Sequence, residues 1–299
     1  MPSSFDAGGF PAVVLDQTFM GLEGEVQSIA DILATKITVQ ALTGTLPVES
    51  SISSLSKNPT AGLAEGAEIP DSVMDFTSAS YTLLRYAGAG SVTDGEREHL
   101  RSMGYEPLTR AARKARAESC AAIDNRLNTV LTTAGSTNAS QATTNGAWSA
   151  TSSTPIADIQ LALRECGKGD TLFLGGSQVE DLVVHPDFTA QFSNFAGGAI
   201  TEGQLANLLT GLFPSVKMVV LGSTVYNSAN PGQTVALAYQ FDGTAWVGWK
   251  RDLLLIEQGG GSSESWRLPR REATAIRFTR RVDIVRPHLE MGCVITGVV

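Results

Sequence analysis

The feature that most constrains the fold is residues 61–76, a stretch that no helix can cross. It contains Gly62, Gly66 and Pro70, which interrupt helices. Both flanks alternate apolar and polar residues as β-strands do. The apolar positions of these flanks include Leu46, Val48, Tyr81 and Leu83. The pattern predicts a long two-stranded excursion with a polar tip, and because an isolated hairpin is marginal in water, we expect it to rest on another surface.

Size and composition indicate a folded chain of about two domains, since it has 299 residues. The hydrophobic content of 42% is enough for a core, while 17% charged residues and 30 glycines favour strands and loops. The net charge of -8 argues against a generic nucleic-acid-binding protein. No apolar run approaches the ~20 residues of a membrane span, and no signal peptide is visible. We therefore expect no membrane partner.

The strongest helix signal covers residues 106–133, with Pro107 in the first turn and Gly135 just past the end. Its second half carries an apolar stripe formed by Ile123, Leu127, Val130 and Leu131. Its first half is basic, with Arg110, Arg113, Lys114 and Arg116. This basic half fits an electrostatic contact with a partner and a solvated helix face about equally well. A shorter helix is predicted from Glu23, with Ile29, Ile32, Leu33 and Ile37 on one face.

A compact α/β unit follows the polar stretch 135–154. A helix is predicted from Thr154-Pro155, a buried strand over 171–174, and a second helix that begins with a capping box, Ser177 to Glu180. This second helix should end before His185-Pro186. Beyond this helix come the segment 205–212 and predicted strands over 217–221, 234–239, 246–249 and 275–285. Because glycine-rich links bracket the unit, we interpret it as an insertion into a domain made of the long helix and the C-terminal strands.

Motifs that carry chemistry are weak in this chain. Ser54 and Lys57 match the SxxK pattern of some hydrolases, but no SDN or KTG motif follows and chance explains the match better. The carboxylates of the excursion do not have the spacing of a calcium loop. Cys120, Cys166 and Cys293 follow no ligand spacing, so we interpret them as small buried hydrophobic residues. We therefore expect no catalytic, cofactor or metal site.

Arginines concentrate between Trp266 and Arg286, where seven of them face two acidic residues, a local charge of +5. One interpretation is contact with nucleic-acid phosphates. The other is ion pairing with acidic loops on neighbouring copies of the chain, because the arginine fork matches a carboxylate. The acidic chain and the lack of interleaved aromatic residues favour the second. Alternation in the last strand predicts one apolar face, with Ile276, Phe278, Val282 and Ile284, and one polar face, with Arg277, Thr279, Arg281 and Asp283.

The order of these parts resembles a known family. A flexible arm precedes a long loop carrying Ala64-Glu-Gly-Ala-Glu-Ile-Pro70 and Phe76, and a long helix comes next. An inserted α/β unit containing residues 175–182, Gly-Gly-Ser-Gln-Val-Glu-Asp-Leu, and a return strand complete the order. This order resembles the major capsid proteins of tailed bacteriophages, the Hong Kong 97-type shell fold. The resemblance covers essentially the whole chain, and the Glu-Gly-Ala-x-Ile-Pro element is its most specific part.

The resemblance implies an α+β chain with four parts. Residues 1–39 would be the N-terminal arm and 40–86 the extended loop. Residues 87–151 with 259–299 would form the peripheral domain, with the long helix as its spine. Residues 152–258 would form the axial domain. Contacts between subunits would then involve Glu65, Glu68, Ile69, Pro70, Asp71, Phe76, Arg110, Arg113, Arg277, Arg280 and Arg281.

The implied function is structural: copies close into hexamers and pentamers of an icosahedral virion that holds double-stranded DNA, assembled in the cytoplasm of a bacterial host. Some relatives join subunits covalently through a loop lysine and an asparagine. Here Lys57 is the only lysine between Lys36 and Lys114, and no asparagine follows Asn230, so we expect a non-covalent shell that relies on separate cement proteins. About 44 residues precede the loop, so scaffolding, like the portal, should come from separate chains. Two alternatives stay open: an encapsulin-like nanocompartment with protein cargo, and, more remotely, a hydrolase that uses Ser54 and Lys57.

Overall fold

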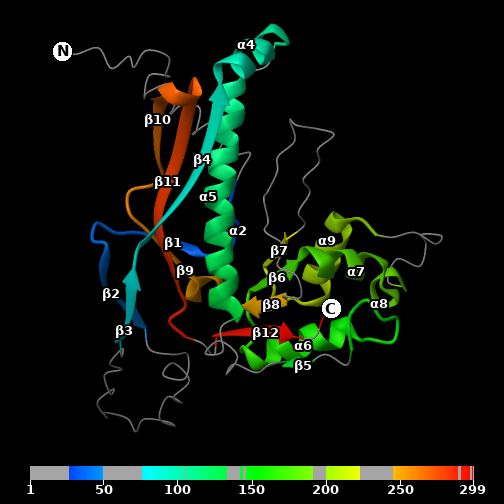
Figure 1. Cartoon of the computed structure of the whole chain (residues 1–299). Coiled ribbons are helices and arrows are strands. Elements are labelled where there is room, and N and C mark those ends of the chain that lie inside the picture. Colours follow the sequence, from blue (N-terminus) through cyan, green and yellow to red (C-terminus); the bar gives the residue numbers. More distant parts are fainter. Residues whose placement is uncertain are drawn as a thin grey trace.

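The computed structural model describes residues 27–49, 76–104, 106–132, 142–143, 146–190, 200–222, 245–288, 291–296 and 298. These residues form a mixed α+β fold with two five-stranded sheets and a separate two-stranded ribbon. Figure 1 shows an elongated unit, built on the first sheet, beside a rounder unit built on the second.

The first sheet has a long central strand, β11 (Ala273–Val285), with neighbours on both sides. Its order is β1 (Thr35–Thr38), β9 (Leu254–Glu257), β11 and β10 (Ser262–Leu268), and β4 (Leu84–Thr93) pairs with the other edge of β11. β1 runs parallel to β9, whereas β4, β9 and β10 all run antiparallel to β11. The turn from β9 into β10 uses Gly259 and Gly260, whose φ angles of 68° and 81° suit glycine.

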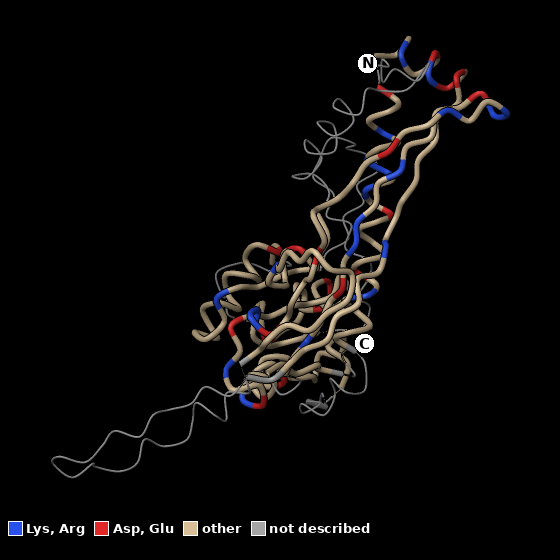
Figure 2. Tube along the Cα trace, turned by 90° about the vertical axis from the view of Figure 1, so that its left-hand side faces the viewer, with Lys and Arg blue, Asp and Glu red and all other residues tan. Residues whose placement is uncertain are grey.

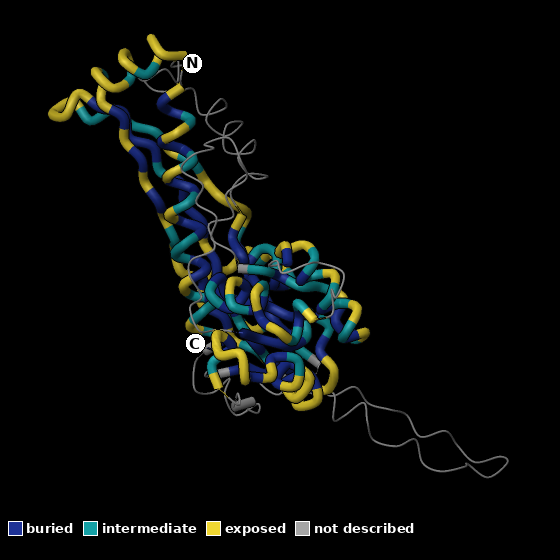
Figure 3. The backbone as a smooth tube through the Cα atoms, turned by 90° about the vertical axis from the view of Figure 1, so that its right-hand side faces the viewer, coloured by how far each residue is buried: buried dark blue, intermediate teal, exposed yellow. Residues whose placement is uncertain are grey.

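The helix α5 (Pro107–Thr132) lies along this sheet and confirms the predicted long helix (Figure 1). Its outer half approaches β4 closely enough that two positions of β4 must lack a side chain. A Cβ on Gly88 would lie 1.9 Å from the carbonyl oxygen of Ala115, and a Cβ on Gly90 would lie 2.3 Å from that of Ala111. Figure 3 shows α4 (Asp94–Ser102), which has no buried residue, projecting beyond the end of the sheet.

The second sheet is mixed and has helices packed against it. Its order is β5 (Ala142–Thr143), β12 (Gly292–Thr296), β8 (Ala245–Gly248), β6 (Thr171–Gly175) and β7 (Met218–Gly222). The helices are α6 (Pro155–Glu165), α7 (Gly176–Val184), α8 (Pro186–Thr189) and α9 (Glu202–Leu212). Buried residues from these helices, from one face of the sheet and from the segment before α6 form a core that includes Trp148, Ile159, Leu163, Phe188 and Leu205.

The opposite face of the second sheet is also buried. Phe173 and Trp246 pack with Ile123 and Leu127 of α5 and with Val282 of the first sheet. The two sheets are therefore joined by a continuous apolar core at the inner half of α5.

The two-stranded ribbon consists of β2 (Thr43–Glu49) and β3 (Phe76–Thr82), antiparallel, and confirms the predicted pairing of the two flanks. Thr43 pairs with Thr82 next to the first sheet, and Glu49 pairs with Phe76 at the far end. The base of the ribbon packs on the sheet through Tyr81, which is buried with residues of β9.

Three strands lie on the other side of the expected domain boundaries. β9 is in the first sheet although the sequence places it in the axial unit, and β5 and β12 are in the second sheet although the sequence places them in the peripheral unit. These differences arise because strand partners are distant in sequence: β9 pairs with β1 and β11, and β12 pairs with β5 and β8.

Two local predictions are wrong. Ile37 does not belong to a helix, since α2 (Ile29–Leu33) ends before it and Ile37 lies in β1. Ser177 does not cap α7: the helix begins at Gly176 without a side-chain cap, and the Ser177 hydroxyl accepts from Gln178 Nε2 at 2.8 Å. Capping boxes form instead at Thr93, which begins α4, and at Thr201, which begins α9. The remaining short elements are the 3₁₀ turns η2 (Lys250–Asp252) and η3 (Pro269–Arg271).

Candidate functional site

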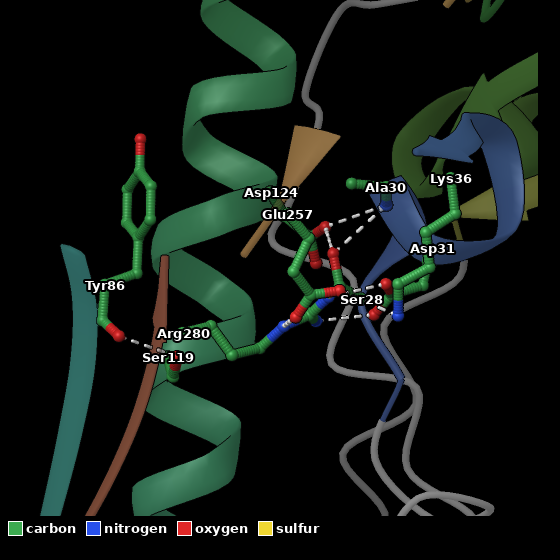
Figure 4. A network of polar contacts seen from close by, with 9 residues as sticks. All are labelled: Ser28, Ala30, Asp31, Lys36, Tyr86, Ser119, Asp124, Glu257 and Arg280. Atoms are coloured by element: carbon green, nitrogen blue, oxygen red, sulfur yellow. Dashed lines mark hydrogen bonds and ion pairs between the residues drawn. The ribbon is translucent and has the colours of Figure 1, made fainter. Parts of the chain in front are cut away.

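A buried ionic cluster holds the start of the described chain against the first sheet (Figure 4). Its centre is Arg280 of β11, whose side chain is only 5% exposed. The guanidinium donates to Asp31 Oδ2 and Oδ1 at 2.7 and 2.8 Å, and to Glu257 Oε1 and Oε2 at 3.0 and 3.2 Å. Lys36 Nζ lies 2.8 Å from Glu257 Oε2. We call these four residues the ionic anchor, because they tie α2 and β1 to β9 and β11.

The pKa values in the ionic anchor follow from this pairing. Burial alone would raise the pKa of Asp31 and of Glu257, but hydrogen bonds and the charge of Arg280 outweigh burial and leave both values lowered. Burial alone would lower the pKa of Arg280, and the two carboxylates outweigh it and raise that pKa. Asp31, Glu257 and Arg280 are therefore charged at neutral pH. The formal charges of the four residues sum to zero.

The place of Arg280 in the strand predicts that its side chain is buried, although arginine side chains usually lie at the surface. Arg280 has the same parity along β11 as Phe278 and Val282, so strand alternation places it on the face that packs against the core. Arg280 is one of the arginines that the sequence places at subunit contacts. In the structure its donors are used inside its own chain, so we leave Arg280 out of the surfaces proposed below.

A second buried polar contact anchors α2 to α5. Asp124 of α5 accepts from the hydroxyl of Ser28, which is the N-cap of α2, and from the backbone N–H of Ala30 at 3.2 Å. Asp124 is fully buried, and its Oδ2 has no hydrogen-bond partner among the described residues. Burial is the main cause that raises the pKa of Asp124 to about 7, while the two hydrogen bonds oppose this shift.

Asp124 should make the stability of the fold depend on pH. Because its pKa is raised on folding, its stabilising contribution is full below the unfolded pKa of about 4 and is lost as pH rises through about 7. We expect the free energy of unfolding to fall by up to ~1.4 kcal/mol per pH unit between pH 5 and 7. Asp124→Asn, which cannot ionise, should remove this decline, as measured by urea unfolding at pH 5, 6, 7 and 8.

The matched control for Asp124→Asn is Asp94→Asn. The hydrogen bond from Arg267 lowers the pKa of the surface carboxyl of Asp94, so this group stays ionised throughout the range. Asp94→Asn should therefore keep the decline seen in the unaltered chain. Equal slopes for the unaltered chain and Asp124→Asn would contradict the assignment.

The other arginines expected at subunit contacts lie at the surface of the elongated unit, where Figure 2 shows basic residues along its length. Arg277 pairs with Glu264 and stacks over the ring of Trp266, with the guanidinium carbon 5.4 Å from the ring centroid. Arg281 is exposed and donates to Gln258 Oε1 at 3.0 Å. On α5, Arg110 is exposed and Arg113 is half-buried.

Most of the expected loop residues fall outside the described part of the chain. These are Glu65, Glu68, Ile69, Pro70 and Asp71, together with Ser54 and Lys57 of the hydrolase alternative. Phe76 is the first residue of β3 and pairs with Glu49. Their expected roles therefore stay predictions.

The three cysteines and His185 lie inside the fold. All three cysteines are buried, as expected. His185 is buried, and its Nδ1 accepts from the backbone N–H of Asp187, so it caps α8. The described residues contain no group of three or more His, Cys, Asp or Glu side chains that could hold a metal ion. None of the helices in these ranges is both long and apolar enough to cross a bilayer.

Comparison with known proteins finds likeness in structure and none in sequence. No protein-family model matches the chain, and no curated protein sequence matches it. A phage-related protein from Bordetella bronchiseptica has a similar fold, with a TM-score of 0.59 and 13% identity over 96% of each chain.

Two further structures match over nearly the whole chain. A chain of the satellite phage P4 procapsid, a structure that includes the size determination protein, has a TM-score of 0.52 and 10% identity over 99% of this chain and 93% of its own. The virus-like particle from Pyrococcus furiosus has a TM-score of 0.54 and 11% identity over 94% and 97%. The protein therefore has the fold of phage capsid proteins.

Proposed function

We propose that the protein is the major capsid protein of a tailed bacteriophage, with a Hong Kong 97-type fold, and that it assembles into hexamers and pentamers of an icosahedral head. The single observation that carries this proposal is the fold match to the phage-related protein over 96% of both chains. The projecting parts fit the role. The β2–β3 ribbon and α4 extend from the body, as segments that lie on neighbouring subunits would.

The domains that we propose are those expected from the sequence, except that the strands described above belong to the other sheet. The first sheet with α5 would be the peripheral domain, and the second sheet with its helices would be the axial domain around the centres of hexamers and pentamers. Residues 40–86 would be the extended loop, whose described base is the β2–β3 ribbon. The role is structural rather than enzymatic.

The proposed partners are further copies of the chain, enclosed double-stranded DNA, and separate scaffolding, portal and cement proteins. The location is the virion, after assembly in the cytoplasm of the host. Subunit contacts of a few thousand Å² would place such a shell among obligate assemblies.

An encapsulin-like nanocompartment is the alternative, and the similarity to the virus-like particle from Pyrococcus furiosus favours it. It has less support than the phage head, because the phage-related protein matches with the higher TM-score. The contents of purified shells separate the two: nucleic acid in a phage head, protein cargo in a nanocompartment.

Assembly tests the proposal directly. We expect the purified chain, alone or with scaffolding protein from the same phage, to form closed shells visible by negative-stain electron microscopy. On denaturing gels these shells should run as a single band near 31.5 kDa. A ladder of covalent multimers would contradict the non-covalent shell, and a chain that stays monomeric at high concentration under both conditions would contradict the function itself.

A further inference from the structure

A polar hollow of about 510 Å³ lies on the first sheet. Its charged lining consists of Arg85 from β4, Arg277 and Arg281 from β11, and Glu264 from β10, beside the turn 258–261. The neighbours of these residues along β4 and β11, such as Gly88 and Phe278, face α5, so strand alternation directs the hollow away from the helix. We call this feature the arginine hollow.

Positive charge in the arginine hollow is not balanced by the described residues around it. Arg85 and Arg281 are direct cross-strand partners, an arrangement of like charges that disfavours the sheet. Arg277 has a carboxylate partner in Glu264, whereas the side-chain partner of Arg281 within the described ranges is a neutral amide. Across the described ranges no carboxylate pairs with Arg85 or Arg281, so the hollow carries an excess charge of +2.

An excess of negative charge lies in the N-terminal part of the sequence. The 84 residues before Arg85 hold ten Asp and Glu against two lysines, a balance of -8 that equals the net charge of the whole chain. Within them, residues 58–84 contain no Lys or Arg. The acidic residues of this stretch are Glu65, Glu68, Asp71 and Asp75.

The direction of the ribbon indicates which copy supplies these acids. Arg85 follows the near end of the ribbon, where Thr82 pairs with Thr43. The residues that flank the acidic stretch are Glu49 and Phe76, paired at the far end, about 20 Å further along strands of seven residues. The acidic stretch is therefore joined to the chain at the end of the ribbon that is farther from its own hollow.

We propose that the arginine hollow binds the acidic stretch 65–75 of a second copy of this chain. Arg85 and Arg281 would each gain a carboxylate, which removes the cross-strand repulsion and fixes the register of neighbouring subunits. This inference rests on the proposed assembly into shells, and it names the partner surfaces of one contact in that assembly.

Charge reversal on each side tests the contact. Arg85→Glu with Arg281→Glu should lower the yield of shells at least about tenfold, since attraction becomes repulsion. Glu65→Arg with Glu68→Arg should do the same. Combining all four changes in one chain should restore assembly. The matched control is Arg270→Glu with Arg271→Glu, the same change of charge at two exposed arginines outside the hollow, which should assemble normally.

Mixing the two defective chains distinguishes a second copy from the same copy. If the contact joins two copies, each chain supplies the surface that the other needs, and the mixture should form hexamers and larger assemblies although neither chain does alone. Yields are measured by sedimentation and electron microscopy, and thermal unfolding of the unassembled chains shows whether each variant is folded.

Several results would overturn the inference. Normal assembly of the hollow variant or of the loop variant would do so, as would an equal loss in the control. Recovery in the four-fold variant without recovery in the mixture would place the contact within one chain. If the hollow variant formed normal shells that lacked only nucleic acid, we would conclude that the hollow binds nucleic-acid phosphates instead. A defect with Asp6→Arg and Asp16→Arg instead of the loop variant would assign it to the N-terminal acids. Failure of the unaltered chain to assemble would contradict the proposed function instead.

Discussion

Arg280→Ala is expected to lower the free energy of unfolding by ~3–5 kcal/mol, the range found when one partner of a buried ion pair is removed. The substitution leaves Asp31 and Glu257 facing each other without the guanidinium that binds both. Lys36 would remain near Glu257, but its side chain is 53% exposed and has a single cationic group. Chemical denaturation at pH 7 measures the difference.

The matched control is the next residue, Arg281→Ala. The side chain of Arg281 is exposed and, among the residues that the structure describes, bonds only to Gln258, so its removal should change the free energy of unfolding by less than ~0.5 kcal/mol. Arg280→Lys should fall between the two alanine variants, because a lysine keeps the charge but cannot bind two carboxylates side by side. Similar costs for Arg280→Ala and Arg281→Ala would show that the ionic anchor does not stabilise the fold.

Gly88→Ala is expected to cost ~3 kcal/mol, at the upper end of the usual range for overpacking. The added Cβ would lie 1.9 Å from the carbonyl oxygen of Ala115, and the obstacle is helix backbone rather than a movable side chain. Either α5 moves away from β4 or the strand bends, and both changes disrupt packing along the sheet. Thermal unfolding measures the loss.

Gly95→Ala provides the comparison, because nothing lies within 4 Å of a Cβ at this position of α4. The alanine should leave stability unchanged or raise it by up to ~1 kcal/mol through helix propensity. If Gly88→Ala proved as harmless as Gly95→Ala, the close packing of α5 against β4 would be wrong.

Elements defined by local pattern could be predicted from the sequence. The long helix needed only its terminal signals and apolar stripe, and the strand over 275–285 needed only alternation. The two flanks of the excursion were also recognisable, since both alternate around a stretch that excludes helices. In each case the information lies within one window of the chain.

Features that depend on distant partners could not be predicted in the same way. Thr35 to Thr38 become a strand because β9 offers a parallel edge, and β9 is more than 200 residues away. Asp124 looks like an ordinary charged position of a helix until α2 packs its N-terminus against it. The charge of Arg280 suggested a surface, although its parity along the strand indicated the interior. For such residues the surroundings decide, and they exist only after folding.

The two halves of α5 are packed to different extents, and this difference has a mechanical consequence. Its inner half, with Ile123, Leu127 and Leu131, is embedded between two sheets, whereas its outer half rests on one sheet through Ala111 and Ala115. A force applied at α4 would therefore act on a helix whose C-terminal half is packed on two sides and whose N-terminal half is packed on one side only. Bending of α5 should therefore concentrate between residues 107 and 120, while the inner half of the helix moves together with the rounder unit.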